Sequence, residues 1–141
     1  MENRIILLIE DNPDDAELIL RAFKKHTIMN PVVLARDGGE ALEYLIGPDA
    51  YDPSRIGFVL LDLKLPKVDG LEVLRRIREN EKTKFLPVVI LTSSKEDRDL
   101  IEGYRLGTNS YVQKPIDFNQ FSEAVRQVGL YWLIVNVPPP S

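Results

Sequence analysis

The chain has 141 residues, of which 44% are hydrophobic and 28% are charged, a composition typical of one compact globular domain. It contains no cysteine and a single histidine, His26, which excludes disulfide scaffolds, thiol catalysis and cysteine-ligated metal sites and disfavours histidine-based catalysis. The formal net charge of −4 gives no overall positive field, so we expect a protein or small-molecule partner and neither nucleic acid nor membrane.

No targeting or membrane-spanning segment is recognisable in the sequence. No apolar run reaches the length needed to cross a bilayer. The first four residues lead directly into a strand-like segment without the pattern of a signal peptide. We therefore expect a cytoplasmic protein.

Five short apolar segments rich in β-branched residues predict five strands. In chain order they cover residues 5–9, 32–35, 58–61, 88–91 and 111–112. Their hydrophobicity is continuous rather than alternating, as in strands that are covered on both faces. The sequence therefore predicts a parallel sheet.

Segments with helical spacing of apolar residues lie between and after these strands. Their inward faces are predicted to comprise four sets: Ala16, Ile19, Leu20 and Phe23; Ala41, Leu42 and Leu45; Leu71, Leu74 and Ile77; and Phe121, Val125, Val128 and Trp132. Another helix is predicted over 95–106, before Gly107, and the last helix is predicted to begin near Asp117. Strand and helix thus alternate five times, which predicts a doubly wound α/β sandwich, with one long connection over 47–57.

Polar residues directly follow four of the five strands, at the edge where open parallel sheets bind ligands. They are Glu10 and Asp11, then Asp62, then Thr92, Ser93 and Ser94, and finally Lys114. Taken singly, the first acids could form a turn, the hydroxyls could cap a helix, and Lys114 could be a surface charge. Asp62, however, lies within a hydrophobic stretch, where an unpaired carboxylate would be costly.

Carboxylates without accompanying histidine or cysteine favour Mg²⁺, with Mn²⁺ as an alternative, because such ions prefer oxygen ligands and leave positions for phosphate oxygens. A carboxylate can attack phosphorus and form an aspartyl phosphate when the charge of the transferred group is neutralised. The metal and Lys114 would supply positive charge, and the Thr92 hydroxyl could donate to a phosphoryl oxygen.

These motifs resemble the receiver domain of bacterial two-component response regulators. The resemblance runs from residue 5 to about residue 128 and rests on residues 9–11, 61–66 with 69–70, 91–93 and 111–115. It implies a flavodoxin-like (βα)5 sandwich whose parallel strands have the order 2-1-3-4-5. It also implies a phosphoacceptor signalling protein rather than an enzyme, with a sensor histidine kinase as its partner.

The same resemblance implies a role for each residue near the metal. Asp62 would be the phosphoacceptor and a metal ligand. Asp11 would bind the metal directly, Glu10 would assist through water, and Lys64 would contribute its backbone carbonyl. Glu10 stands where many members of the family have a second aspartate.

Further residues would bind the phosphoryl group and transmit its presence. Lys114 would pair with the phosphoryl group, Thr92 would move toward it, and Tyr111 would then change rotamer; alternatively, Tyr111 is only a half-buried strand aromatic. Lys64 and Ser94 would tune the approach of the hydrolytic water. The surface of the fourth helix, fifth strand and fifth helix would change and bind a downstream protein.

The C-terminal segment departs from a bare receiver. We expect a receiver domain over 1–128 and, over 129–141, an extension of the last helix followed by a Pro-rich tail. Residues 130–135 are apolar on every side, which favours a homodimer contact through Tyr131, Trp132 and Leu133; the alternative is an intramolecular cap. With the long 47–57 connection, this ending is similar to stand-alone response regulators of phytochrome-type kinases.

Three other function classes fit parts of the pattern. A hydrolase of the haloacid-dehalogenase type would need a second aspartate at position 64, where the chain has lysine. A phosphorylation-independent interaction domain would usually lack Asp62, Asp11 or Lys114, and all three are present. A flavodoxin-type cofactor protein would need a phosphate-binding loop after the first strand, and residues 10–15 include four acids.

Overall fold

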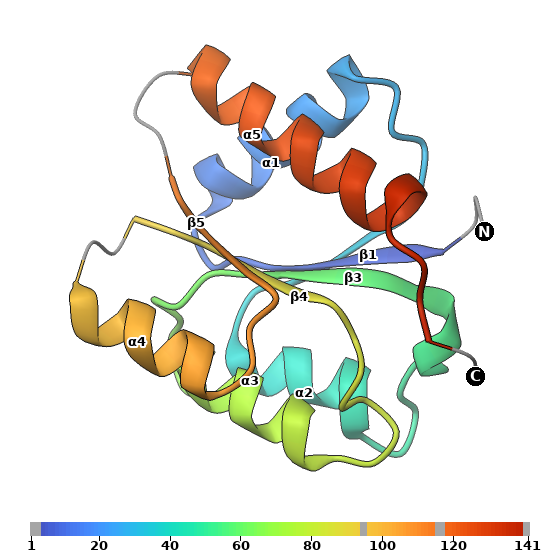
Figure 1. The fold of residues 1–141 in the computed structure, drawn as a ribbon, viewed down its shortest axis with the longest axis vertical. Coiled ribbons are helices and arrows are strands. Elements are labelled where there is room, and N and C mark those ends of the chain that lie inside the picture. Colours follow the sequence, from blue (N-terminus) through green and yellow to red (C-terminus); the bar gives the residue numbers. More distant parts are fainter. Residues whose placement is uncertain (1–3, 94–95, 115–117, 140–141) are drawn as a thin grey trace.

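A computed structural model describes residues 4–93, 96–114 and 118–139. Its five strands form one parallel sheet with the order β2-β1-β3-β4-β5 (Figure 1). The strands are β1 (Ile5–Ile9), β2 (Val32–Ala35), β3 (Ile56–Leu61), β4 (Val88–Thr92) and β5 (Ser110–Gln113). The predicted sheet and strand order are therefore confirmed.

Helices cover both faces of the sheet. They are α1 (Pro13–Lys25), α2 (Gly38–Ile46), α3 (Gly70–Glu79), α4 (Asp97–Arg105) and α5 (Phe118–Leu130). Figure 1 shows α1 and α5 on one face and α2, α3 and α4 on the other. The predicted first residue of the last helix, Asp117, lies outside the described residues, as does Ser94.

Two hydrophobic clusters fill the space between the sheet and its helices. Alternate residues of β1 divide between them: Leu7 and Ile9 belong to the cluster under α2 and α3, whereas Ile6 and Leu8 belong to the cluster under α1 and α5. All five β1 residues are buried, because side chains on opposite faces of the strand each meet a helix layer. This arrangement accounts for the continuous apolar runs in the sequence.

Two helix faces differ from the predicted ones. Leu20 in α1 is 39% exposed, and Ala22 is buried instead. Leu71 in α3 is half-buried, and Val73 occupies the fully buried position. In both helices the inward stripe is rotated slightly from the predicted one. Residues three and four positions further along a helix both lie close to the face of the starting residue, so the spacing alone does not decide between them.

The C-terminal segment folds back on its own domain. After α5 the chain makes a wider π-type turn, η2 (Tyr131–Val135), which passes the amino ends of β1 and β3 (Figure 1). Trp132 is only 8% exposed and joins the cluster under α1 and α5. Leu133 packs so closely that a Cβ atom on Gly57 would lie 2.8 Å from its Cδ2.

Trp132 lies on the inward stripe predicted for the last helix, and this burial corrects the expectation that Trp132 itself is accessible for a dimer contact. Its indole is covered by the same chain, because the inward stripe of α5 continues through it. Tyr131 lies edge-on to Trp132 and remains 48% exposed, and Ile134 is 73% exposed. Among the described residues, no helix is long and apolar enough to cross a membrane.

Candidate phosphorylation site

The predicted site residues meet at the carboxyl edge of the sheet. Backbone hydrogen bonds continue beyond the strands and fix their positions: the Glu10 N–H donates to the Ala35 carbonyl, at 2.9 Å, and the Asp62 N–H donates to the Ile9 carbonyl, at 3.0 Å. The Lys114 N–H donates to the Thr92 carbonyl, at 2.8 Å. The ends of β2, β1 and β3 are thus tied together, as are the ends of β4 and β5.

Lys114 lies at the centre of a carboxylate cluster. Its Nζ donates to Glu10 Oε1 at 2.8 Å, to Asp15 Oδ2 at 2.7 Å and to Asp62 Oδ2 at 3.0 Å. The Lys114 side chain is 9% exposed. Because an ammonium group has three N–H donors, these carboxylates occupy all of them.

Backbone N–H groups hold the remaining oxygens of the two buried acids. The Lys64 N–H donates to Asp62 Oδ1 at 3.1 Å, and the Asn12 N–H donates to Glu10 Oε2 at 3.2 Å. Asp62 and Glu10 are 6% and 2% exposed. Each acid is therefore held in one orientation from both sides.

The three buried groups differ in how readily they ionise. Burial, reinforced by the charge of Asp62, raises the pKa of Glu10 to about 8 against the opposing effect of Lys114. Burial also opposes the ionisation of Asp62, but the charge of Lys114 and the surrounding hydrogen bonds outweigh it and lower the pKa of Asp62. Burial likewise disfavours charged Lys114, but the hydrogen bonds that its ammonium donates to Asp15 and Glu10 prevail and raise the pKa of Lys114.

The acids also form a group that could hold a metal ion. One oxygen atom from each of Glu10, Asp11 and Asp62 lies within 4.8 Å of the others. Asp11 is exposed, so this group opens to solvent. Two buried carboxylates share one ammonium with Asp15, and an oxygen-preferring divalent cation would supply the positive charge that the cluster lacks. The residues therefore fit Mg²⁺ or Mn²⁺.

Thr92 and Tyr111 lie on adjacent strands beside this cluster. Thr92 is fully buried at the end of β4. Tyr111 pairs with Ile90 in the sheet register and is half-buried against the α2/α3 cluster. A Cβ atom on Gly103 of α4 would lie 3.5 Å from Tyr111 Cδ2, so the Tyr111 ring lies next to α4. This placement is compatible with a switch and with a plain core aromatic.

Asp15 is a member of the cluster that the sequence did not reveal. Asn12 caps α1 by accepting hydrogen bonds from the N–H groups of Asp14 and Asp15, and Pro13 begins the helix. This cap directs the first turn so that Asp15 reaches Lys114. Acids in a first helical turn are common because they complement the helix dipole, and nothing in the sequence distinguishes Asp15 from Asp14.

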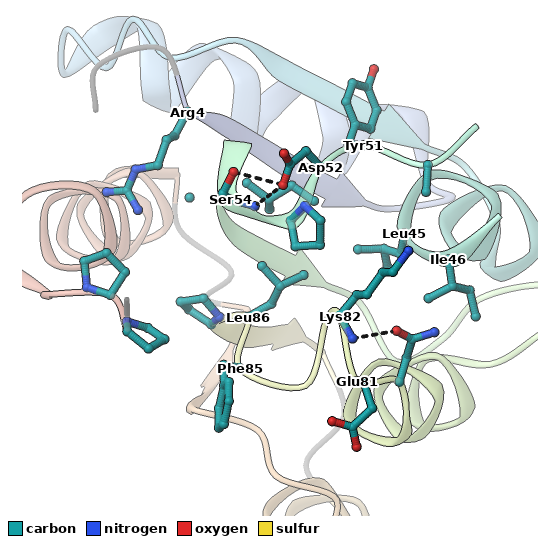
Figure 2. Close-up of a pocket in the computed structure, with 18 of the residues that line it drawn as sticks. Arg4, Leu45, Ile46, Tyr51, Asp52, Ser54, Glu81, Lys82, Phe85 and Leu86 are labelled. Carbon is teal, nitrogen blue, oxygen red and sulfur yellow. Dashed lines mark hydrogen bonds between the residues drawn. The ribbon is translucent and has the colours of Figure 1, made fainter. Parts of the chain in front are cut away.

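A large groove lies at the opposite edge of the sheet and contains none of these groups. It has a volume of about 950 Å³ and is lined by the amino ends of β1 and β3, the connections after α2 and α3, and Pro138 and Pro139. Figure 2 shows Arg4, Phe85 and Lys82 among its lining residues. The acids and Lys114 are therefore at the other end of the strands, and the groove is separate from the site.

The chain is similar to known signalling proteins along most of its length. The response regulator receiver domain matches residues 6–126. The probable methanogenesis regulatory protein FilR2 of Methanothrix harundinacea is 44% identical over 96% of this chain and 87% of its own length.

Two solved structures have the same fold over nearly the whole chain. The phosphorylated cyanobacterial phytochrome response regulator RcpA is 36% identical, with a TM-score of 0.89 over 98% of this chain and 99% of its own. The Mn²⁺-bound response regulator Rcp1 is 34% identical, with a TM-score of 0.86 over 97% of this chain and 99% of its own. This chain therefore belongs to the response regulator receiver domain family.

Proposed function

We propose that this protein is a stand-alone response regulator in a two-component phosphorelay, which accepts a phosphoryl group from a sensor histidine kinase onto Asp62. The observation that carries the proposal is the position of Asp62, buried at the carboxyl edge of the sheet with Oδ2 3.0 Å from Lys114 Nζ. Its lowered pKa keeps the carboxylate ionised, and only the ionised form is a nucleophile.

The phosphoryl transfer needs an oxygen nucleophile and neutralised charge. An oxygen of Asp62 forms the bond to phosphorus while the bond from phosphorus to the kinase histidine nitrogen breaks. The ammonium of Lys114 compensates negative charge on the phosphoryl oxygens. Glu10, Asp11, Asp62 and the backbone carbonyl of Lys64 would hold Mg²⁺, which when bound supplies further positive charge to those oxygens.

We propose that phosphorylation is transmitted through Thr92 and Tyr111 to the surface of α4, β5 and α5. The Thr92 hydroxyl would turn toward the phosphoryl group, and the Tyr111 ring, which lies next to α4, would occupy the space released. In α4, Ile101 and Tyr104 are 60% and 53% exposed, which provides an apolar contact for a downstream protein. Lys64 and Ser94 would tune the hydrolysis of the phosphorylated state.

The partnership with a phytochrome-type kinase is proposed on the similarity to RcpA, a cyanobacterial phytochrome response regulator. We place the protein in the cytoplasm, where it would act without binding nucleic acid or membrane. Residues 1–128 would form the receiver domain, and 129–141 would contribute to a homodimer.

The homodimer proposal is supported by the exposed apolar side chains of the C-terminal segment. Tyr131, Ile134 and Val135 are 48%, 73% and 62% exposed, whereas Trp132 and Leu133 would support this surface from beneath. Sedimentation should show that Ile134→Glu shifts a dimer to a monomer. Met29→Glu, at a position 82% exposed elsewhere on the molecule, should leave the dimer intact. A monomeric wild-type chain would overturn the dimer.

Phosphorylation is tested directly with Mg²⁺ and labelled acetyl phosphate. The wild type and an Asp49→Asn control, which alters an exposed acid in the connection after α2, should acquire acid-stable, base-labile phosphate. Asp62→Asn should acquire none. Equal labelling of all three proteins would overturn the site, and turnover of many donor molecules per protein would instead indicate a hydrolase.

A further inference from the structure

Asp15 makes the shortest of the three contacts to Lys114, at 2.7 Å. It differs from the other two acids in its surroundings, because its side chain is 30% exposed, whereas the side chains of Glu10 and Asp62 are 1% and 7% exposed. It also lies outside the group of oxygens that could hold the metal. Asp15 therefore contacts the ammonium without belonging to the expected metal ligands.

During phosphorylation, the incoming phosphoryl group must compete with the carboxylates that already accept hydrogen bonds from Lys114. Glu10, Asp15 and Asp62 take all three N–H donors of the ammonium in the unphosphorylated chain. An incoming phosphoryl group needs at least one of these donors and also needs the positive charge that the carboxylates neutralise. Because Asp15 is partly exposed, water can hydrate its carboxylate when the contact to Lys114 breaks or lengthens.

We propose that Asp15 is a positioning residue that holds Lys114 and limits how strongly the ammonium stabilises a phosphoryl group on Asp62. The inference rests on the proposed phosphorylation of Asp62 and adds a regulating residue to that site. Asp15 acts through Lys114. The positive charge of Lys114 either compensates the carboxylates of the unphosphorylated chain or attracts the phosphoryl oxygens, and Asp15 favours the first of these interactions.

The reaction with acetyl phosphate changes the negative charges that surround Lys114. An Asp62 oxygen forms a bond to phosphorus, the bond from phosphorus to the acetate oxygen breaks, and acetate leaves with the electron pair. The Asp62 carboxylate loses its charge in the new bond, while the phosphoryl oxygens bring about two negative charges. Lys114 then has a weaker acceptor in Asp62 and a stronger one in the phosphoryl group, and the charge of Asp15 competes with that new contact.

Asp15→Asn removes this charge but keeps an oxygen acceptor of similar size. The ammonium of Lys114 is then less neutralised, so it should attract the phosphoryl group more strongly and repel Mg²⁺ more strongly. At saturating Mg²⁺ we expect labelling by acetyl phosphate to become about threefold to tenfold faster. Calorimetric titration should show Mg²⁺ binding weakened by a factor of about three to ten.

The opposite signs of these two effects separate positioning from a merely structural role, since a disturbed site would both bind Mg²⁺ more weakly and react more slowly. Asp14→Asn is the matched control, because Asp14 is an exposed acid in the same helical turn; it should change both quantities by less than about twofold. Asp15→Glu, which restores the charge, should return both quantities toward the wild-type values.

Several results would overturn the inference. Labelling of Asp15→Asn at or below the wild-type rate would do so, as would equal changes in Asp14→Asn and Asp15→Asn. Thermal unfolding of each variant identifies any that does not fold, and Asp15→Ser would then replace Asp15→Asn. A wild-type chain that takes up no phosphate contradicts the proposed function, whereas a labelled wild type with an unaccelerated Asp15→Asn contradicts only the role of Asp15.

Discussion

The two edges of the sheet satisfy their buried polar groups in opposite ways. At the carboxyl edge, one ammonium serves three carboxylates, and burial raises the pKa of Glu10 to about 8. At the amino edge, the guanidinium of Arg78 donates to the carbonyls of Lys84, Leu86 and Gly107 and to Asn109 Oδ1, at 2.7–3.1 Å. The carboxyl edge therefore has more negative than positive charge. At the amino edge, neutral oxygens accept the hydrogen bonds of a single cation.

Because of this difference, the two edges contribute differently to the stability of the fold. The Arg78 contacts link the end of α3 to the connections before β4 and β5, and neutral carbonyls accept each of these hydrogen bonds. They stabilise the fold without needing a ligand. The carboxyl edge remains undercompensated until a cation or a change of protonation balances it. We infer that the Arg78 contacts at the amino edge contribute to stability, whereas the polar groups of the carboxyl edge serve the proposed reaction.

The strongest test of this comparison removes the Arg78 guanidinium. Arg78→Met keeps an apolar stem but leaves several carbonyls without their donor, so we expect a loss of about 2–4 kcal/mol in the free energy of unfolding. Urea unfolding measures this change. Arg76→Met, at an exposed position of the same helix, should change the free energy of unfolding by less than about 0.5 kcal/mol, and equal losses in the two variants would contradict the assignment.

A second test uses the pH dependence of stability at the carboxyl edge. The pKa of Glu10 is raised from 4.5 to about 8, so the folded chain binds this proton more tightly than the unfolded chain does. The corresponding stability is fully present below pH 4.5 and is lost as the pH rises through about 8. The lowered pKa of Asp62 acts in the opposite direction, but only in the acidic range.

Metal-free wild-type protein should therefore lose about 1–3 kcal/mol of unfolding free energy between pH 5 and pH 8. Glu10→Gln, which cannot ionise, should show a flatter profile. Mg²⁺ should restore stability at pH 8, because an ion that binds only the folded state stabilises it. Denaturant unfolding in the presence of a chelator measures these profiles, and parallel profiles for the two proteins would contradict the role of Glu10.

The sequence predicts the carboxyl edge well because its residues follow recognisable strands. Continuous apolar runs end directly before Glu10, Asp62 and Thr92. The parallel arrangement of the strands alone therefore brings these residues to one edge of the sheet. Asp15 is different, because its contact to Lys114 depends on the direction in which Asn12 starts α1 relative to the end of β5. That relation is tertiary and leaves no local pattern.

The amino edge is predicted less well for the same physical reason. The acceptors of Arg78 are backbone carbonyls in separate connections, and any residue type provides a carbonyl. For Trp132, helical periodicity indicates an inward position, whereas the apolar run around it suggests an exposed interface. The structure favours the periodicity for Trp132 and leaves Tyr131 and Ile134 exposed.

The smallest expected change in stability is that of a Lys64 variant. This variant distinguishes the contribution of the Lys64 side chain from that of its backbone N–H group at the carboxyl edge. Its Nζ lies 4.0 Å from Asp99 Oδ2 and its side chain is 61% exposed, so Lys64→Ala should change the free energy of unfolding by less than about 0.5 kcal/mol. The Lys64 N–H that holds Asp62 is retained in this variant, and labelling should persist. If the exposed side chain tunes the hydrolytic water, decay of the labelled wild type and Lys64→Ala should differ in rate at equal stability. Equal decay rates would limit Lys64 to its backbone contact with Asp62.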